Sequence, residues 1–123
     1  MVERIVEVTT PEQYQTLKPG DIVFEPWGQV GFLSEVKDAR TIKPLYDEKS
    51  GRILPSSAYV KVKPLSDYWR EHTLGPNDSP VFLLPKSLIN SGDDQLVDRV
   101  REAADGLRLD PGVIVKAITI YRN

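Results

Sequence analysis

Residues with the chemistry for catalysis are few in this sequence. His72 is the only histidine and cysteine is absent, so a Ser-His-Asp arrangement would have to use His72, and a zinc site would need carboxylates for nearly every other ligand. No second histidine stands at helical spacing from "REH". We therefore expect His72 to be an ordinary surface or packing residue, and we expect no catalytic residue, no metal site and no cofactor.

Adjacent carboxylates are the other candidates, because Mg²⁺ needs only one or two when waters or phosphates complete its shell. They occur at Asp47 with Glu48 and at Asp93 with Asp94. Sequence neighbours in a strand point apart, and the second pair suits the positive N-terminal end of a helix. The "GDD" segment also lacks the glycine loop and the lysine of a phosphate site. The sequence therefore favours a protein that is not an enzyme, with a small hydrolase or nuclease as the last alternative.

Positive charge gathers in the middle of the chain. The net charge of −2 divides into −4 for residues 1–36, +4 for residues 37–70 and −2 for residues 71–123. Basic groups neutralise phosphates and aromatic rings stack on bases, so a nucleic-acid contact surface in this segment is an alternative function. Its residues are Arg40, Lys43, Arg52, Lys61 and Lys63. The same pattern is typical of a solvated sheet face whose lysines discourage edge pairing.

Aromatic side chains in and before this segment predict a protein interface. Trp27 lies between Pro26 and Gly28, where its own neighbours do not easily cover it, and rigid aromatics are favoured interface anchors. The other interpretation is that Trp27 folds back onto the sheet. The expected protein-binding residues are Trp27, Tyr59, Tyr68 and Trp69.

Alternating hydrophobicity predicts the strands that carry these side chains. "ERIVEVT" indicates a first strand, and Thr10 with Pro11 then starts a helix of one or two turns. "KPGD" is a type II turn into the strand "DIVFE", which Pro26 ends, so that "PWGQ" is a loop tip or a bulge. The next run, "QVGFLSEV", places four side chains on one face: Val30, Phe32, Ser34 and Val36.

Further segments complete an antiparallel sheet. Gly31 is expected as a bulge or close-packing point, "KDA" as a turn, "RTIKPLYD" as an extended edge segment and "DEKSG" as a polar turn. "SAYVKVKPL" alternates, with Val60 and Val62 inward. Lys61 and Lys63 then share the opposite face with Tyr59.

The end of the chain predicts a strand, a helix and a final strand. "VFLL" is a short buried strand, and "SGDDQLVDRVREAADGL" is a helix that Ser91 caps and Gly106 stops. The β-branched run "VIVKAITIYRN" predicts a terminal strand. The apolar stripe of the helix consists of Leu96, Val97, Val100, Ala103, Ala104 and Leu107.

The order "KPGDIV", loop, "GQVGFLSEV", turn, "IKPLYD" and "AYVKV" resembles the small SH3-like barrels, including KOW and Tudor-type modules. The resemblance covers residues 17–65 and implies a small, strongly bent antiparallel sheet. "GDIV" is also similar to the opening of MazF-type endoribonuclease toxins, but this chain lacks their arginine-proline run, so no catalytic residue is carried over. Residues 80–123 lie outside the resemblance and would close or buttress the sheet.

The sequence therefore predicts one α+β domain over residues 1–123: an SH3-like barrel or strongly bent sheet, a C-terminal amphipathic helix and a terminal strand. No apolar stretch approaches the roughly twenty residues of a membrane span, and the start of the chain lacks the apolar core of a signal peptide, so we expect a cytoplasmic protein without a membrane partner. The expected function is that of a non-catalytic adaptor or accessory protein on a larger protein or nucleoprotein assembly. Small size without catalytic motifs also suits a viral host-interacting or structural protein. The alternative partner is DNA or RNA.

Overall fold

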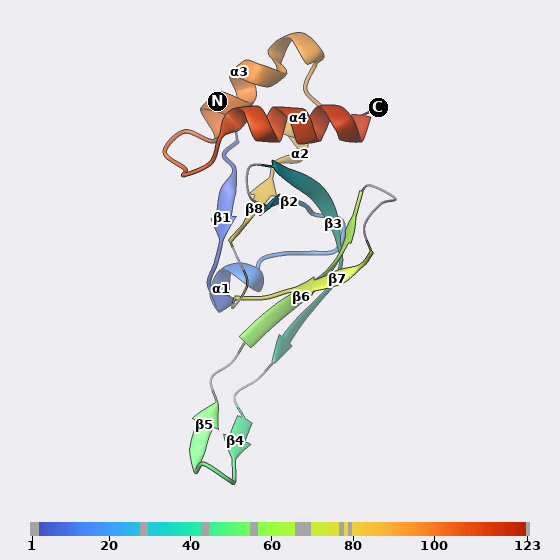
Figure 1. The fold of residues 1–123 in the computed structure, drawn as a ribbon. Helices are drawn as coiled ribbons and strands as arrows, with labels where there is room; N and C mark the ends of the chain where they lie inside the picture. Colours follow the sequence, from blue (N-terminus) through green and yellow to red (C-terminus); the bar gives the residue numbers. More distant parts are fainter. Residues whose placement is uncertain are drawn as a thin grey trace.

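The computed structural model of the 123-residue chain describes residues 3–27, 30–42, 45–54, 57–65, 70–76, 78 and 80–122. Three helices gather at one end of the molecule, a six-stranded sheet lies in the middle, and a two-stranded ribbon stands at the other end (Figure 1). The elements in chain order are β1 (Val6–Val8), α1 (Pro11–Tyr14), β2 (Ile22–Trp27), β3 (Val30–Ile42), β4 (Leu45–Asp47), β5 (Arg52–Leu54), β6 (Ser57–Pro64), β7 (His72–Leu74), β8 (Val81–Leu84), α2 (Lys86–Ile89), α3 (Asp93–Ala103) and α4 (Pro111–Arg122).

The main sheet has the strand order β1-β8-β2-β3-β6-β7, and every neighbouring pair is antiparallel. Strands β4 and β5 pair with each other as a separate two-stranded sheet. The predicted α+β class with an antiparallel sheet is therefore confirmed. Strands β1 and β7 form the two edges of an open sheet, so closure into a barrel is not seen and the SH3-like barrel stays a prediction.

Each face of the sheet carries its own apolar core. Neighbouring residues of one strand enter different cores because side chains alternate along a strand: Val23 packs with Tyr14 of α1, whereas Phe24 packs beneath α3 and α4. The core under the helices includes Ile22, Phe24, Leu33, Phe82, Leu84, Leu96, Val100, Ile114 and Ile118. The core on the other face includes Val8, Tyr14, Leu17, Val23, Val36, Val60, Val62, Leu74 and Val81.

The N-terminal turns follow the predicted chemistry. Thr10 caps α1 by accepting a hydrogen bond from the Gln13 amide at 3.2 Å, and Pro11 occupies the first turn. The turn after α1 is closed by the Asp21 amide, which donates to the Lys18 carbonyl at 3.0 Å, and Gly20 has the positive φ of 96° that this turn requires.

The β2–β3 hairpin corrects the prediction that Pro26 ends its strand. β2 continues to Trp27, with Pro26 opposite Gly31 in the register. The prediction that Gly31 is a close-packing point is confirmed, because a Cβ atom there would lie 2.2 Å from the ring of Phe24 and 2.8 Å from the carbonyl oxygen of Glu25. Only glycine lets this ring sit against the backbone of β3.

The turn predicted at "KDA" is wrong. β3 runs through it as one strand, and the register against β6 shifts between Val36 and Asp38, which marks a β-bulge. The extra residue bends the strand without ending it, and Figure 1 shows β3 curving from beneath α4 toward the ribbon. The alternation predicted for β6 is confirmed, since Val60 and Val62 are buried whereas Lys61 and Lys63 are exposed.

The predicted terminal strand is also wrong, because residues 111–122 form helix α4. Pro111 stands at its first position, and the Asp110 carboxylate accepts a hydrogen bond from the Gly112 amide at 2.9 Å. The buried residues Ile114, Ala117 and Ile118 lie on one helical stripe against the core. Burial of that stripe outweighs the β-propensity of the branched side chains.

Helix α3 is confirmed, but it is shorter than predicted at both ends. It starts at Asp93 with Gly92 at the cap position, and Ser91 makes no cap. It ends at Ala103, before the predicted stop at Gly106. The Ser91 hydroxyl instead donates to the Ser87 carbonyl at 3.0 Å and accepts from Arg99 at 3.3 Å.

Candidate functional site

The four predicted protein-binding residues are placed only in part. Trp27 is the last residue of β2, opposite Val30, and its side chain lies outside the described part of the structure. Tyr68 and Trp69 lie wholly outside the described residues. Tyr59 is half-buried on β6, opposite Arg40.

Three of the five residues of the predicted basic surface lie on one face of the folded sheet. Arg40, Lys61 and Lys63 are exposed on one face of the β3–β6 pair, as the alternation predicted. Arg52 lies on β5, in the separate ribbon, and Lys43 lies outside the described residues.

Carboxylates lie opposite these basic groups. In the strand register Lys63 lies opposite Glu35 and Lys61 lies opposite Asp38. The ion pairs join Lys37 to Glu35, Lys61 to Glu71 at 3.9 Å, and Arg40 to Asp38 at 2.9 Å. The hydrogen bond from Arg40 lowers the pKa of Asp38, which keeps that carboxylate ionised. The positive charge counted along the middle of the chain is therefore largely compensated on the folded surface, which does not favour a phosphate-binding face.

A buried polar cluster that the sequence did not predict lies on the other face of the sheet, opposite the face that carries Lys61 and Lys63. Glu25 is 8% exposed, and Ser34 is fully buried. The Ser34 hydroxyl donates to Oε2 of Glu25 at 2.5 Å, and Nε2 of His72 lies 2.7 Å from Oε1 of the same carboxylate. Both oxygens of a nearly buried glutamate are thus engaged, as a buried charge requires.

The contact between Glu25 and His72 also reports the curvature of the sheet. Their strands, β2 and β7, are three steps apart in the order β2-β3-β6-β7. A flat sheet would separate them by about 14 Å, since neighbouring strands lie about 4.8 Å apart. Because the two side chains meet at 2.7 Å, the sheet curls strongly around this face.

The hydrogen bonds of His72 favour its protonated form. Nδ1 lies 3.1 Å from the carbonyl oxygen of Arg70, which can only accept, and Nε2 faces a carboxylate. A neutral imidazole has only one N–H, so it would leave one of these acceptors without a donor. Burial lowers the pKa of His72, but the bonds to Glu25 and Arg70 and the negative charges of Glu25 and Asp78 outweigh burial and raise the pKa above its ordinary value.

A pocket of about 260 Å³ opens beside this pair. Asp78, from the loop between β7 and β8, forms part of the wall, and its Oδ2 accepts a hydrogen bond from the Gly75 amide at 2.7 Å. The ring of Phe32 stands edge-on to the imidazole of His72, with the centroids 6.3 Å apart. Leu74, Pro80 and Val81 line the apolar part of the pocket.

Tyr14 lies close to the same wall. It packs with Leu74 and Val81 in the core, and its buried hydroxyl has no hydrogen-bond partner within the described part of the chain. Burial raises the pKa of Tyr14 to about 12, and the charges of Asp78 and Glu25 add to the shift.

The cluster lacks the connectivity of a nucleophile relay. In such a relay the histidine lies between the serine and the carboxylate, whereas here the carboxylate lies between Ser34 and His72. Ser34 is also fully buried, away from any substrate. Among the described residues, no three histidine or carboxylate side chains converge as a metal site.

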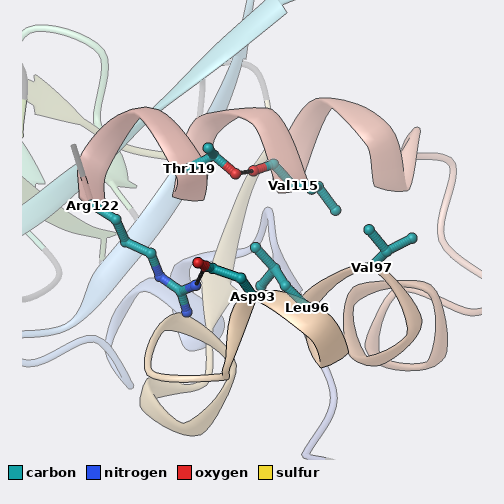
Figure 2. Close-up of a pocket in the computed structure, with 6 residues that line it drawn as sticks. All are labelled: Asp93, Leu96, Val97, Val115, Thr119 and Arg122. Carbon is teal, nitrogen blue, oxygen red and sulfur yellow. Dashed lines mark hydrogen bonds and ion pairs between the residues drawn. The ribbon is translucent and has the colours of Figure 1, made fainter.

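A larger hollow of about 380 Å³ lies between α3 and α4 (Figure 2). Arg122 and Asp93 close one end with an ion pair of 2.9 Å, and Val97 lies toward the other end. Arg122 also donates to the Ile89 carbonyl at 3.1 Å and to the Ser91 carbonyl. Its guanidinium therefore ties the end of α4 to the start of α3, which is a structural role.

The β4–β5 ribbon is the other distinctive surface. It stands away from the helices at the far end of the molecule (Figure 1). Tyr46 and Ile53 lie directly opposite each other across its two strands, and they are 66% and 73% exposed. A large aromatic and a branched aliphatic side chain thus form an exposed apolar pair on an isolated hairpin.

The sequence contains only part of the information needed to predict the polar cluster. Glu25 stands two residues after Val23 in "DIVFE", so the alternation of the strand indicates that its carboxylate points to the same side as Val23. Ser34 was predicted to share a face with Val36, and both side chains are fully buried. Nothing in the sequence links either residue to His72 or Asp78, because the contact depends on the curl of the sheet.

Comparison of the chain with protein-family models, with curated proteins and with solved structures gave no significant match. Among the described residues, no helix has the length and apolarity needed to cross a membrane.

Proposed function

We propose that this protein is a non-catalytic accessory module that binds a larger protein through the β4–β5 ribbon. The supporting observation is the exposed cross-strand pair of Tyr46 and Ile53. An isolated two-stranded hairpin is only marginally stable in water, so a ribbon that exposes two large apolar side chains gains from a protein surface that covers them. Tyrosine is also among the residues that contribute most to protein interfaces.

The charges of the ribbon favour a protein over a nucleic acid. Asp47 and Glu48 balance Lys49 and Arg52 over residues 45–54, so this segment offers no net positive charge to a phosphate backbone. Asp47 also accepts hydrogen bonds from the Lys49 amide and the Ser50 hydroxyl, which fixes the turn that presents the pair.

The test compares the unchanged protein, a ribbon variant and a control variant. Each is tagged and purified from the native cell, and the co-purifying proteins are identified by mass spectrometry. Tyr46→Ser combined with Ile53→Ser should lose the partner that the unchanged protein retains. Ile120→Ser is the matched control, because Ile120 is 63% exposed on α4, far from the ribbon (Figure 1). Surface changes of this kind alter stability by less than about 0.5 kcal/mol, so loss of folding does not explain the result.

The outcome is then checked with the purified partner. Titration calorimetry should give at least a tenfold weaker affinity for the ribbon variant, since a central aromatic anchor contributes about 2 kcal/mol or more. Equal binding by the ribbon variant and the control would refute the ribbon as the interface.

The nucleic-acid alternative stays a prediction with its own test. If Lys61 and Lys63 contact phosphates, affinity for DNA or RNA falls steeply with salt, and the combined Lys61→Ala and Lys63→Ala change lowers both the affinity and the salt slope. Absence of binding at low salt removes this alternative. The hydrolase or nuclease alternative requires turnover that a single substitution at His72 or Glu25 abolishes.

The SH3-like barrel belongs with these proposals. The strong curl that brings His72 of β7 to Glu25 of β2 supports a partly open barrel of strands β8, β2, β3, β6 and β7.

A further inference from the structure

The pocket beside Glu25 and His72 holds more hydrogen-bond acceptors than donors. Each oxygen of Glu25 accepts one bond, from Ser34 or from His72, and keeps a second acceptor site. Asp78 accepts one bond at Oδ2, from the Gly75 amide. The two ring nitrogens of His72 already face a carboxylate and a backbone carbonyl, so the ring offers no further donor.

Negative charge also exceeds positive charge in the pocket. The carboxylates of Glu25 and Asp78 face a single imidazolium, that of His72, and all three side chains line the pocket. One negative charge is therefore in excess when His72 is protonated, and two when it is neutral. An anion would be repelled, whereas a cation would complete the pairing.

The size and lining of the pocket limit what fits. Its volume of about 260 Å³ is below the roughly 300–1,000 Å³ typical of drug-sized ligands, so it suits one small functional group with a short stem. Leu74, Pro80 and Val81 provide the apolar surface along which an aliphatic stem could lie.

We propose that this pocket binds an organic cation, an ammonium or guanidinium group carried on a short aliphatic stem. These groups are donors only, so they match a site that has acceptors left over. No group of three ligands for a metal ion occurs among the described residues, which favours an organic cation. The site is distinct from the β4–β5 ribbon, and this inference does not depend on the ribbon binding a partner.

The affinity should depend on pH in a defined direction. Loss of the proton from His72 removes a positive charge that competes with the ligand, so cation binding strengthens as the pH rises through the pKa of His72. By linkage, the bound cation lowers the pKa of His72. The charged groups that act on His72 are Glu25 from β2 and Asp78, which follows β7 in the chain.

The test uses ethylguanidinium as the probe and N-ethylurea as its uncharged counterpart. Binding of each compound is monitored by the NMR chemical shifts of the backbone amides of Thr73, Gly75 and Asp78. Ethylguanidinium should give saturable shifts at these amides, whereas N-ethylurea should not. The His72 ring signals, titrated with and without the probe, should show a lower pKa in its presence. Saturable shifts with both compounds, or with neither, would overturn the proposal.

Variants separate a ligand site from a structural cluster. Asp78→Asn keeps an acceptor for the Gly75 amide but removes the charge, and it should weaken ethylguanidinium binding about three- to fivefold. Asp98→Asn, an equally conservative change of an exposed carboxylate on α3, should leave the affinity unchanged. Equal effects of the two substitutions contradict the site.

A Gly-Arg-Gly peptide distinguishes the source of the cation: tighter binding than ethylguanidinium indicates an arginine of another protein, and equal binding indicates a free small molecule.

Discussion

The Glu25–His72 ion pair should make the stability of this fold depend on pH in one direction. The partners of His72 raise its pKa in the folded protein above the ordinary value of about 6.5 that it has when unfolded. A group of this kind contributes stability that is fully present below the unfolded pKa and is lost as the pH rises through the folded pKa. The fold should therefore lose the contribution of His72 toward alkaline pH.

The size of the effect follows from the geometry. A hydrogen bond to a charged group contributes about 1.5–3 kcal/mol when it is buried. The side chain of His72 is 35% exposed, so solvent screening reduces the expected contribution to about 1 kcal/mol. That is roughly a fivefold change in the folding equilibrium.

The assay is urea unfolding of the unchanged protein and of His72→Gln between about pH 5.5 and pH 9, which brackets the titration of histidine. Because His72 is the only histidine, the difference between the two proteins isolates its titration from that of the carboxylates. The unchanged protein should be more stable by about 1 kcal/mol at the acid end, and this advantage should disappear at the alkaline end.

Glu25→Gln supplies the control, since removing the carboxylate should also remove the pH dependence of the difference. An advantage that is constant over this range, or that grows with pH, would refute the ion-pair reasoning. An NMR titration that places the pKa of His72 below its unfolded value would do the same.

Further substitutions test the packing. Gly31→Ala forces a Cβ atom into the ring of Phe24 and should destabilise the fold by about 1–3 kcal/mol, measured by urea unfolding. Ser34→Ala leaves one oxygen of the buried carboxylate without its donor and should cost about 1–3 kcal/mol by the same assay. Ile118→Ala on the buried face of α4 should cost about 2–5 kcal/mol, whereas Ile120→Ala on its exposed face should change stability by less than about 0.5 kcal/mol; equal costs would contradict the helix.

The local chemistry of the chain predicts its local structure well. The cap at Thr10, the turn at Gly20, the alternation of β6 and the close packing of Gly31 each depend on residues within a few positions of one another. Such features can be predicted because their cause is contained in a short segment. The same holds for most of the amphipathic stripe of α3, because Leu96, Val100 and Ala103 are buried, but Val97, which was assigned to the stripe, is 44% exposed.

The errors arise where distant contacts decide the outcome. The residues 111–122 are β-branched enough to suggest a strand, but Ile114 and Ile118 find a core only as one face of a helix, against α3 and the sheet. The bulge after Val36 likewise replaces a predicted turn, because pairing with β6 continues on both sides of it. Neither result can be obtained from a window of sequence.

The candidate site also depends on contacts between residues that are distant in the sequence. For this reason the sequence predicted a different surface. Counting charge along the chain highlighted Lys61 and Lys63, yet strand pairing places Glu35 and Asp38 opposite them. Glu25 and His72 are 47 positions apart and belong to strands that are not neighbours, so only the curl of the sheet brings them together. Folding thus compensates the charges that are conspicuous in the sequence, and it concentrates uncompensated acceptors in a pocket that the sequence does not reveal. The Glu25–His72 contact depends on this curvature, so substitutions that relax the bend at the β3 bulge should weaken the contact without touching either residue.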